Sequence, residues 1–373
     1  MMHIELHDTT DLEVHLAQHG SLAGTVCQGL DLRQQTDRLA GVPVHGAFFL
    51  GCRFAPAGLQ AVTEGGAVVF PDLPDLPYRP YRSRLYAASE LMDGYVRGKD
   101  GSFYDDTADS AIYRHYQAHK NNGAPPIIEA LAQRLHDHAI DDALHDFLRH
   151  HPKVVGIMGG HAMRRGAAPY RAVAQMGQLL TQRGYLVATG GGPGAMEAGN
   201  LGAWFAEASP DALDAAIDQL AEAPHYRDAR YLDAAYAVRD QYPEGGTSLA
   251  IPTWFYGHEP TNLFASHVAK YFANSLREDG LLAIATHGVV YAPGSAGTIQ
   301  EVFMDAAQNH YVTFEVVSPM VFFGTTYWTE TKPVHPLVQT LAADKPYADA
   351  LALTDDPEEA VAFIEAHPPW VPA

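Results

Sequence analysis

The sequence predicts an α/β fold: a doubly wound parallel sheet with helices on both faces, preceded by an additional α+β region. Two observations predict this fold. From residue 153 onward, short apolar runs alternate with segments of helical periodicity, which is typical of parallel strands buried on both faces. Two of the runs end in clusters of small residues, 190–194 and 294–297, at the strand ends where such sheets bind their ligands.

Apolar runs and amphipathic segments take turns along this part of the chain. The expected strands lie within residues 153–160, 185–192, 248–255, 288–293, 318–324 and 350–356. The expected helices lie within residues 168–183, 195–208, 266–279, 298–311, 335–344 and 356–367. Gly184 stops the first helix, because glycine readily adopts the left-handed conformation that ends helices. The alternation indicates βαβ units rather than hairpins.

The sequence pattern changes near residue 150 and divides the chain into two parts. Residues 1–150 are irregular and are expected to form an N-terminal accessory region, whereas residues 151–373 are expected to form one Rossmann-like domain. An acidic, Ala-rich insertion near 207–247 interrupts this domain, and we expect it to be helical and peripheral. The N-terminal region has two expected short strands within 42–54 and 65–76, and one or two amphipathic helices within 130–151.

Composition limits the classes of partner. The chain of 373 residues has a formal net charge of −20, and nucleic-acid binding depends mostly on cationic contacts to phosphate, so we expect no nucleic-acid partner. Two cysteines, Cys27 and Cys52, suggest a reducing compartment. The first residues are charged and lack an apolar h-region, and no apolar run is as long as a membrane span. We therefore expect a cytoplasmic protein with no membrane partner.

The first cluster of small residues contains Gly190, Gly191, Gly192 and Gly194. Backbone N–H groups without Cβ atoms around them can close on an anion at a helix N-terminus, and phosphate is the anion we expect. The alternative is a tight strand-to-helix turn that binds nothing. The run GIMGGH after the first expected strand does not match the dinucleotide fingerprint, which disfavours NAD.

The second cluster runs from Gly294 to Gly297 and is followed by Thr298 and Glu301. Thr298 and Glu301 have the spacing of a capping box, which would explain the carboxylate as a stabiliser of its own helix. The alternative is that Glu301 acts on a ligand. Two small-residue loops at neighbouring strand ends favour the second interpretation, because together they could hold a phosphate and the sugar attached to it.

Together, GGGPGAMEA and PGSAGTIQE resemble the Lonely Guy (LOG) family, long mislabelled as lysine decarboxylases, whose pattern is PGGxGTxxE. The resemblance covers roughly residues 153–366 and is closer to the longer bacterial members. It implies a phosphoribohydrolase that cleaves the N-glycosidic bond of a nucleoside 5′-monophosphate, giving free base and ribose 5-phosphate. It also implies a homodimer or larger homo-oligomer. No cofactor and no metal is expected.

The resemblance carries over to individual residues. Glu301 is expected to be catalytic, stabilising the oxocarbenium-like transition state and orienting the attacking water. The residues expected to bind substrate and phosphate are Gly191, Gly192, Gly194, Gly294, Ser295, Gly297, Thr298 and Arg277. Ser295 replaces the second glycine of the family pattern, and its small side chain should still permit close approach.

One departure from the family concerns its catalytic arginine. The family has H-x-R-K on the preceding helix, and here the matching segment is HVAK, with Ala269 at the arginine position. On the expected helix a polar stripe, either a solvated face or a ligand-binding one, comprises His267, Lys270, Asn274 and Arg277. We expect Lys270, as a second catalytic residue, or Arg277 to supply the missing cation.

Two other functions fit part of the sequence. A non-catalytic nucleotide sensor or carrier on the same fold is the main alternative, since Ala269 replaces a catalytic residue. A pyridoxal-phosphate decarboxylase would need a Schiff-base lysine, and no lysine has a context typical of one. The histidine-rich segment near residues 135–151 resembles a polar helical face more than a metal site. The sequence does not identify the base.

Overall fold

The computed structural model of the chain describes residues 4–73, 75–120, 125–255 and 257–372. It has two compact units. The first comprises Met1–Leu85 with Gln117–Asp146, and the second comprises Tyr86–Tyr116 with Phe147–Ala373. The predicted boundary at residue 150 lies close to the last crossing between them. Residues 86–116 differ from the prediction, because they pack with the second unit rather than with the N-terminal region.

The first unit is built on a four-stranded parallel sheet of order β1-β2-β3-β4. Its strands are β1 (Ile4–Leu6), β2 (Thr25–Gln28), β3 (Phe48–Leu50) and β4 (Val68–Phe70), and its shorter helices are α1 (Thr9–His19), α2 (Thr36–Ala40) and α3 (Pro56–Glu64). The Asp8 side chain caps α1 by accepting from the N–H groups of Thr10 and Asp11. The two predicted strands are confirmed as β3 and β4. Parallel strands and helices alternate along this region.

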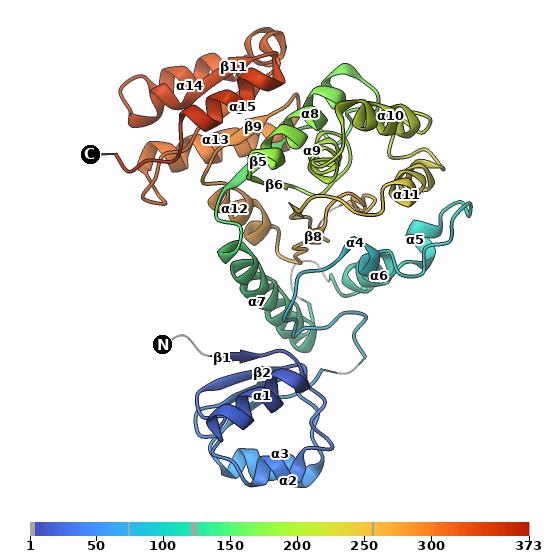
Figure 1. Ribbon diagram of the computed structural model, residues 1–373, viewed down its shortest axis with the longest axis vertical. Helices are drawn as coiled ribbons and strands as arrows, with labels where there is room; N and C mark the ends of the chain where they lie inside the picture. Colours follow the sequence, from blue (N-terminus) through green and yellow to red (C-terminus); the bar gives the residue numbers. More distant parts are fainter. Residues whose placement is uncertain (1–3, 74, 121–124, 256, 373) are drawn as a thin grey trace. The chain divides into compact units, whose positions relative to one another are not determined.

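The second unit contains a seven-stranded parallel sheet, and the predicted doubly wound α/β fold is confirmed (Figure 1). Its strands are β5 (Val154–Met158), β6 (Leu186–Thr189), β7 (Ser248–Ala250), β8 (His267–Val268), β9 (Val289–Tyr291), β10 (Met320–Phe323) and β11 (Leu351–Thr354). The residues of β5, β6, β7, β9 and β10 are buried, because helices cover both faces of the sheet.

The order of this sheet is β11-β10-β9-β5-β6-β7-β8. From β5 the chain adds strands outward to β8 and then returns to place β9 on the other side of β5. This reversal makes the carboxyl ends of β5 and β9 a topological switch point, where open α/β sheets bind their ligands. The backbones are joined there, since the Gly160 N–H donates to the Pro293 carbonyl over 3.0 Å.

Helices pack on both sides of the sheet. The pairs α8 (Ala168–Gln182) with α9 (Ala195–Trp204), and α12 (Asn274–Ile284) with α13 (Ala296–Tyr311), are in contact, and α15 (Pro357–Ala366) packs on α8. The remaining helices of the C-terminal part are α14 (His335–Ala342), the π-helical turn Tyr327–Thr331 and the 3₁₀ turn Pro346–Ala350. None of the helices in the described ranges is long and apolar enough to cross a lipid bilayer.

The insertion is helical, as predicted, but it is not peripheral. It forms α10 (Pro210–Leu220) and α11 (Tyr231–Gln241). Their buried residues, which include Ile217, Leu220 and Val238, join the main hydrophobic core of the unit. The acidic composition reflects only the solvated sides of two amphipathic helices, so composition alone could not show that their other sides are buried.

The preceding part of the second unit consists of α4 (Ala88–Leu91), α5 (Ser102–Asp106) and the start of α6 (Ala108–His119). The long helix α7 (Ile127–Arg149) confirms the predicted helical segment of the N-terminal region. Tyr86 pairs with Val268 of β8 through two backbone hydrogen bonds. The edge strand β8 therefore pairs with a residue that precedes Val268 by 182 positions in the chain.

Candidate active site

A cavity of about 1070 Å³ lies at the switch point of the second unit. Its walls come from the loops that follow β5, β6 and β9, together with the segment between β7 and β8 and the end of the π-helical turn. Both small-residue clusters line it, as the sequence predicts. The cavity is large enough for a nucleotide, since ligand pockets typically measure about 300–1,000 Å³.

Protein side chains explain the glycines of the first loop. A Cβ atom at Gly190 would overlap the guanidinium of Arg277, and one at Gly192 would lie 2.7 Å from the Oε2 atom of Glu259. Gly191 and Gly194 have positive φ angles of 75° and 72°, which disfavour any residue with a side chain. The first loop therefore makes room for an arginine and a glutamate inside the cavity.

The second loop leaves open space at Gly297. This residue lies in the first turn of α13, and among the described residues no atom outside its chain neighbours and its own helix backbone is within 4 Å of the position its Cβ would occupy. The loop-end residue Ser295 is the N-cap of α13 and makes no side-chain capping bond. The N–H groups of the first turn thus meet the cavity at a helix N-terminus, which favours an anion.

The predicted capping box is wrong. The helix begins at Ala296, two residues before Thr298, so Glu301 lies in the second helical turn and not in the first. Thr298 is buried beneath the loop, where its hydroxyl would meet a Cβ at Gly294. Because Glu301 is not needed for capping, another interaction must account for its carboxylate.

That interaction is an ion pair with Arg277. The Arg277 Nη1 atom lies 3.5 Å from the Glu301 Oε1 atom, and both side chains are about nine-tenths buried. The Arg277 Nε group also donates to the Ile251 carbonyl over 3.1 Å, which fixes the guanidinium against the sheet. Two residues predicted to belong to the site, Arg277 and Glu301, are therefore brought together in the cavity wall.

Burial decides the protonation of Glu301. Removal from water raises the pKa of its carboxyl above the ordinary value, the Arg277 charge lowers it in part, and the Glu278 charge raises it. The ion pair therefore does not outweigh desolvation. A carboxylate with a raised pKa is a better general base than an ordinary one, and such shifts are frequent at functional sites.

The expected helix over residues 266–279 is wrong in its first half, and the predicted polar stripe does not exist. His267 and Val268 form β8, the Ala269 N–H donates to the Ala250 carbonyl in the same extended run, and α12 begins only at Asn274. Ala269 is fully buried. It directly follows β8 and its backbone bonds to the end of β7, so its buried side chain does not mark an arginine lost from the cavity.

Lys270 lines the cavity but is held by a buried aspartate. Its Nζ atom lies 2.7 and 2.9 Å from the two carboxylate oxygens of Asp109, which is fully buried on α6. Trp254, His258 and Thr261 also contact that carboxylate. Burial opposes the ionisation of Asp109, but Lys270 and His258 lower its pKa below the ordinary value. Lys270 is thus a partner of Asp109 first, and its predicted catalytic role stays a prediction.

The cavity side chains that no sequence motif marked include Glu259, His161 and Lys332. The Lys332 Nζ atom lies 3.1 Å from the Gly294 carbonyl oxygen and 3.4 Å from the Ser295 hydroxyl, beside the N-terminus of α13. It follows the π-helical turn, whose Tyr327 hydroxyl also donates to the Gly294 carbonyl. Short π-helical segments are frequent at functional sites, but no sequence pattern marks this one.

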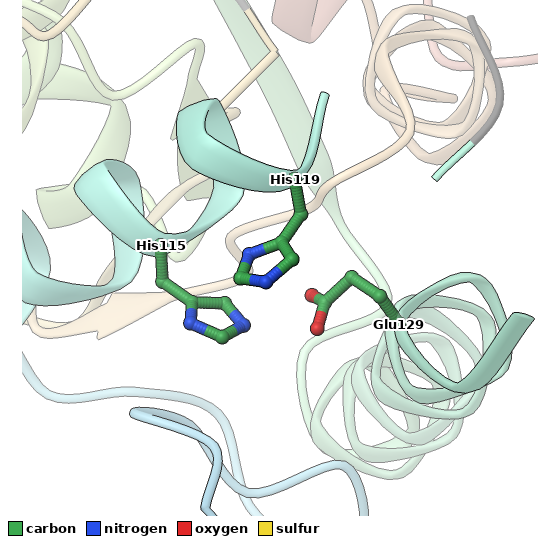
Figure 2. Close-up of side chains that lie close together, drawn as sticks. All are labelled: His115, His119 and Glu129. Atoms are coloured by element: carbon green, nitrogen blue, oxygen red, sulfur yellow. The ribbon is translucent and has the colours of Figure 1, made fainter. Parts of the chain in front are cut away.

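The histidine-rich region lies outside this cavity. It forms α7 as predicted, but His136 and Asp137 on that helix are buried and not on a solvated face. Metal-ligating atoms of His119 and Glu129, both in the first unit, lie within 4.8 Å of one another, and His115 precedes His119 by one turn of α6 (Figure 2). The Glu129 carboxylate already accepts two side-chain hydrogen bonds.

Comparisons with known proteins add little to this geometry. No family model and no curated protein matches the chain. The solved structures to which it is similar, each at a low level of identity, include the following three proteins. The molybdenum cofactor binding protein from Rippkaea orientalis is 14% identical over 57% of this chain and 96% of that chain, with a TM-score of 0.37. The Moco carrier protein from Chlamydomonas reinhardtii is 15% identical over 57% and 96%, with a TM-score of 0.34.

The third is DNA processing protein A from Streptococcus pneumoniae, 13% identical over 58% of this chain and 62% of that chain, with a TM-score of 0.34. Identities and TM-scores this low carry no conclusion about activity or ligand. The fold is established by the strand order of the second unit, and any function has to be argued from the cavity.

Proposed function

We propose that the chain hydrolyses the N-glycosidic bond of a nucleoside 5′-monophosphate, giving free base and ribose 5-phosphate. The observation that carries this proposal is the buried Arg277–Glu301 pair, which lies in the wall of a nucleotide-sized cavity at the switch point of the sheet. The carboxylate of this pair has a raised pKa, and Glu301 belongs to the motif of the second small-residue loop, which resembles the LOG family.

The N-terminus of α13 is the proposed phosphate site. Three features support it: the open position beside Gly297, the N–H groups of the first helical turn, and the ammonium group of Lys332 next to Ser295. A phosphate there would accept charge-assisted hydrogen bonds, which are the stronger kind. Ser295 and Gly297 therefore keep their predicted role in this proposal, with Lys332 added to them, whereas Gly294 and the buried Thr298 shape the loop.

Glu301 lies a little more than one turn further along the same helix. A ribose attached to a phosphate at the start of α13 would extend toward it. As the bond from C1′ to the base nitrogen breaks, positive charge develops on the sugar, and a fixed carboxylate stabilises that charge. Glu301 would also accept a proton from the water that attacks C1′. Arg277 would hold the carboxylate in position through their ion pair.

A nucleotide carrier or sensor is the alternative, and it would use the same cavity. The observation that first favoured it, Ala269 in place of an arginine, has lost its force, because Ala269 lies in the sheet and Arg277 reaches Glu301. A homodimer or larger homo-oligomer, a cytoplasmic location and the absence of a nucleic-acid partner remain predictions.

A screen of all nucleoside 5′-monophosphates, with chromatography of the released base, tests the proposal. We expect wild-type protein to release base from at least one nucleotide, and Glu301→Gln to do so at least about a hundredfold more slowly, since removing one transition-state charge interaction typically costs that much. The variant should still bind the nucleotide and melt near the wild-type temperature.

Glu207→Gln provides the matched control, because Glu207 is an exposed carboxylate outside the cavity lining. It should behave as wild type. Tight nucleotide binding without base release by the wild-type protein would establish the carrier alternative. Full activity in Glu301→Gln would mean that the chemistry does not depend on this carboxylate.

A further inference from the structure

A second carboxylate faces the cavity from the segment between β7 and β8. Glu259 has a side chain that is 35% exposed, and its Oε1 atom lies 3.5 Å from the Nδ1 atom of His161. Its Oε2 atom packs over Gly192, at a place that any side chain on residue 192 would occupy. The first glycine loop is thus shaped to admit this carboxylate.

Glu259 and Glu301 are related through the guanidinium of Arg277. Arg277 packs over Gly190 and Glu259 packs over Gly192, so both side chains contact the same loop, two residues apart. Glu301 pairs with Arg277 from α13. The charge of Arg277 therefore acts on two carboxylates, through the ion pair with Glu301 and by lowering the pKa of Glu259 in part, and all three side chains line the same cavity.

The surroundings of Glu259 favour its protonated form. Burial raises the pKa of its carboxyl, and the charges of His161, Arg277 and Lys270 lower it only in part. Burial also raises the pKa of Glu301, but the two carboxyl groups have different partners, because Glu301 pairs with a permanent cation, Arg277, whereas Glu259 contacts a histidine. Two carboxyl groups held in different environments are the usual means by which one site supplies both an acid and a base.

We propose that Glu259 is the general acid of the reaction, and this inference rests on the proposed function. Its carboxyl proton would pass to a ring nitrogen of the departing base as the C1′–N bond breaks and its electron pair moves onto the base. Water then bonds to C1′ while Glu301 accepts its proton. No electrons are gained or lost overall, and the products are the neutral base and ribose 5-phosphate.

The chemistry requires such a proton. A base that leaves without one departs as an anion, which is a poor leaving group, and general acid catalysis typically contributes about 10²–10⁴-fold. Glycosidases meet the same need with a pair of carboxylates, one acidic and one ionised. His161 would hold the Glu259 carboxyl toward the base through their 3.5 Å contact.

A change of leaving group tests the assignment. Nicotinamide mononucleotide and N7-methylated purine nucleotides carry a cationic base that departs neutral without gaining a proton. We expect Glu259→Gln to slow release of an ordinary base by about a hundredfold or more, and release of a cationic base by less than about threefold. Glu301→Gln should slow both, because the sugar cation forms in either case.

The pH dependence of kcat gives a second readout. A general acid must be protonated, so the wild-type rate on an ordinary nucleotide should fall as the pH rises through the pKa of Glu259, and Glu259→Gln should lack that fall. Glu207→Gln and a melting curve for each variant control for folding.

Equal slowing of both classes of leaving group by Glu259→Gln, or unchanged rates on both, would overturn the proposal, as would a wild-type profile with no fall at high pH. Failure of the wild-type protein to release any base is a different result. It would refute the proposed function itself, and the general acid with it.

Discussion

Gly297 is a glycine that no neighbouring group in the described structure requires. Its φ is not in the left-handed region, and its Cβ position is open to the cavity. Alanine would suit the first turn of α13 better, since replacing glycine within a helix typically gains about 0.5–1 kcal/mol. The absence of a side chain here is therefore a cost to stability, which a ligand that approaches the backbone would explain.

We expect Gly297→Ala to melt at or slightly above the wild-type temperature, yet to bind nucleoside monophosphate at least about tenfold more weakly, which corresponds to about 1.4 kcal/mol. Calorimetric titration and a melting curve measure the two effects separately. Gly294→Ala is the contrasting variant, because its Cβ would overlap Thr298 and should lower the melting temperature. Wild-type affinity in Gly297→Ala would mean that the phosphate does not bind at this turn.

At the scale of single residues, the sequence predicted Glu301 more securely than its partner. Glu301 belongs to a short motif, so its position beside the second loop follows from its distance in sequence along one helix. Arg277 meets it only because β8 and α12 lead the chain back to the same edge of the sheet. Glu259 and His161 belong to no motif, and only the fold of the loops brings them together.

At the scale of elements, five of the six expected strands were predictable because both of their faces are buried, and the sequence shows this as continuous apolar runs. The sixth, the edge strand β11, is mostly half-buried. The segment 266–273 was not predictable. Its polar residues recur at helical spacing, but β8 pairs with β7 and the following residues continue the backbone bonding. Tertiary pairing overrode local propensity there, and a two-residue strand is too short to show a period of its own.

The contact between α6 and the end of β8 leads to a prediction about Lys270. Removing one partner of a buried ion pair typically costs about 3–5 kcal/mol, because the other charge is left uncompensated. We expect Lys270→Ala to lower the melting temperature by several degrees, since Asp109 is fully buried. Adding Asp109→Asn should restore much of the loss, because the amide oxygen can still accept from the Trp254 indole N–H.

Base release by the Lys270→Ala/Asp109→Asn double variant separates the two roles of the lysine. Recovery of both stability and activity would show that Lys270 supports the cavity wall. Recovery of stability with a rate still a hundredfold below wild type would identify it as a catalytic cation, as the resemblance first implied. Ala269→Arg would not test this point, because Ala269 is fully buried and an arginine would not fit there.

At the scale of the whole molecule, the net charge of −20 opposes an anionic substrate. Affinity for a phosphate must therefore be local. The cavity lining supplies four cationic side chains, Arg164, Lys270, Arg277 and Lys332, and a helix N-terminus, but Lys270 and Arg277 are already paired with Asp109 and Glu301. Lys332 contacts a carbonyl and a hydroxyl, so among the described cavity residues it is best placed to neutralise a phosphate.

This local arrangement predicts that the 5′-phosphate is indispensable. Two charge-assisted hydrogen bonds at about 1.5–3 kcal/mol each correspond to a factor of about 10²–10⁴. If part of that energy positions the sugar against Glu301, a substrate without phosphate loses kcat as well as affinity, because binding energy from a remote group assists the reacting centre. We expect kcat/KM for a nucleoside to fall by at least about a hundredfold relative to its 5′-monophosphate. Lys332→Ala should narrow this difference by slowing only the nucleotide, whereas equal rates on adenosine and AMP in the wild-type protein would mean that the start of α13 binds no phosphate.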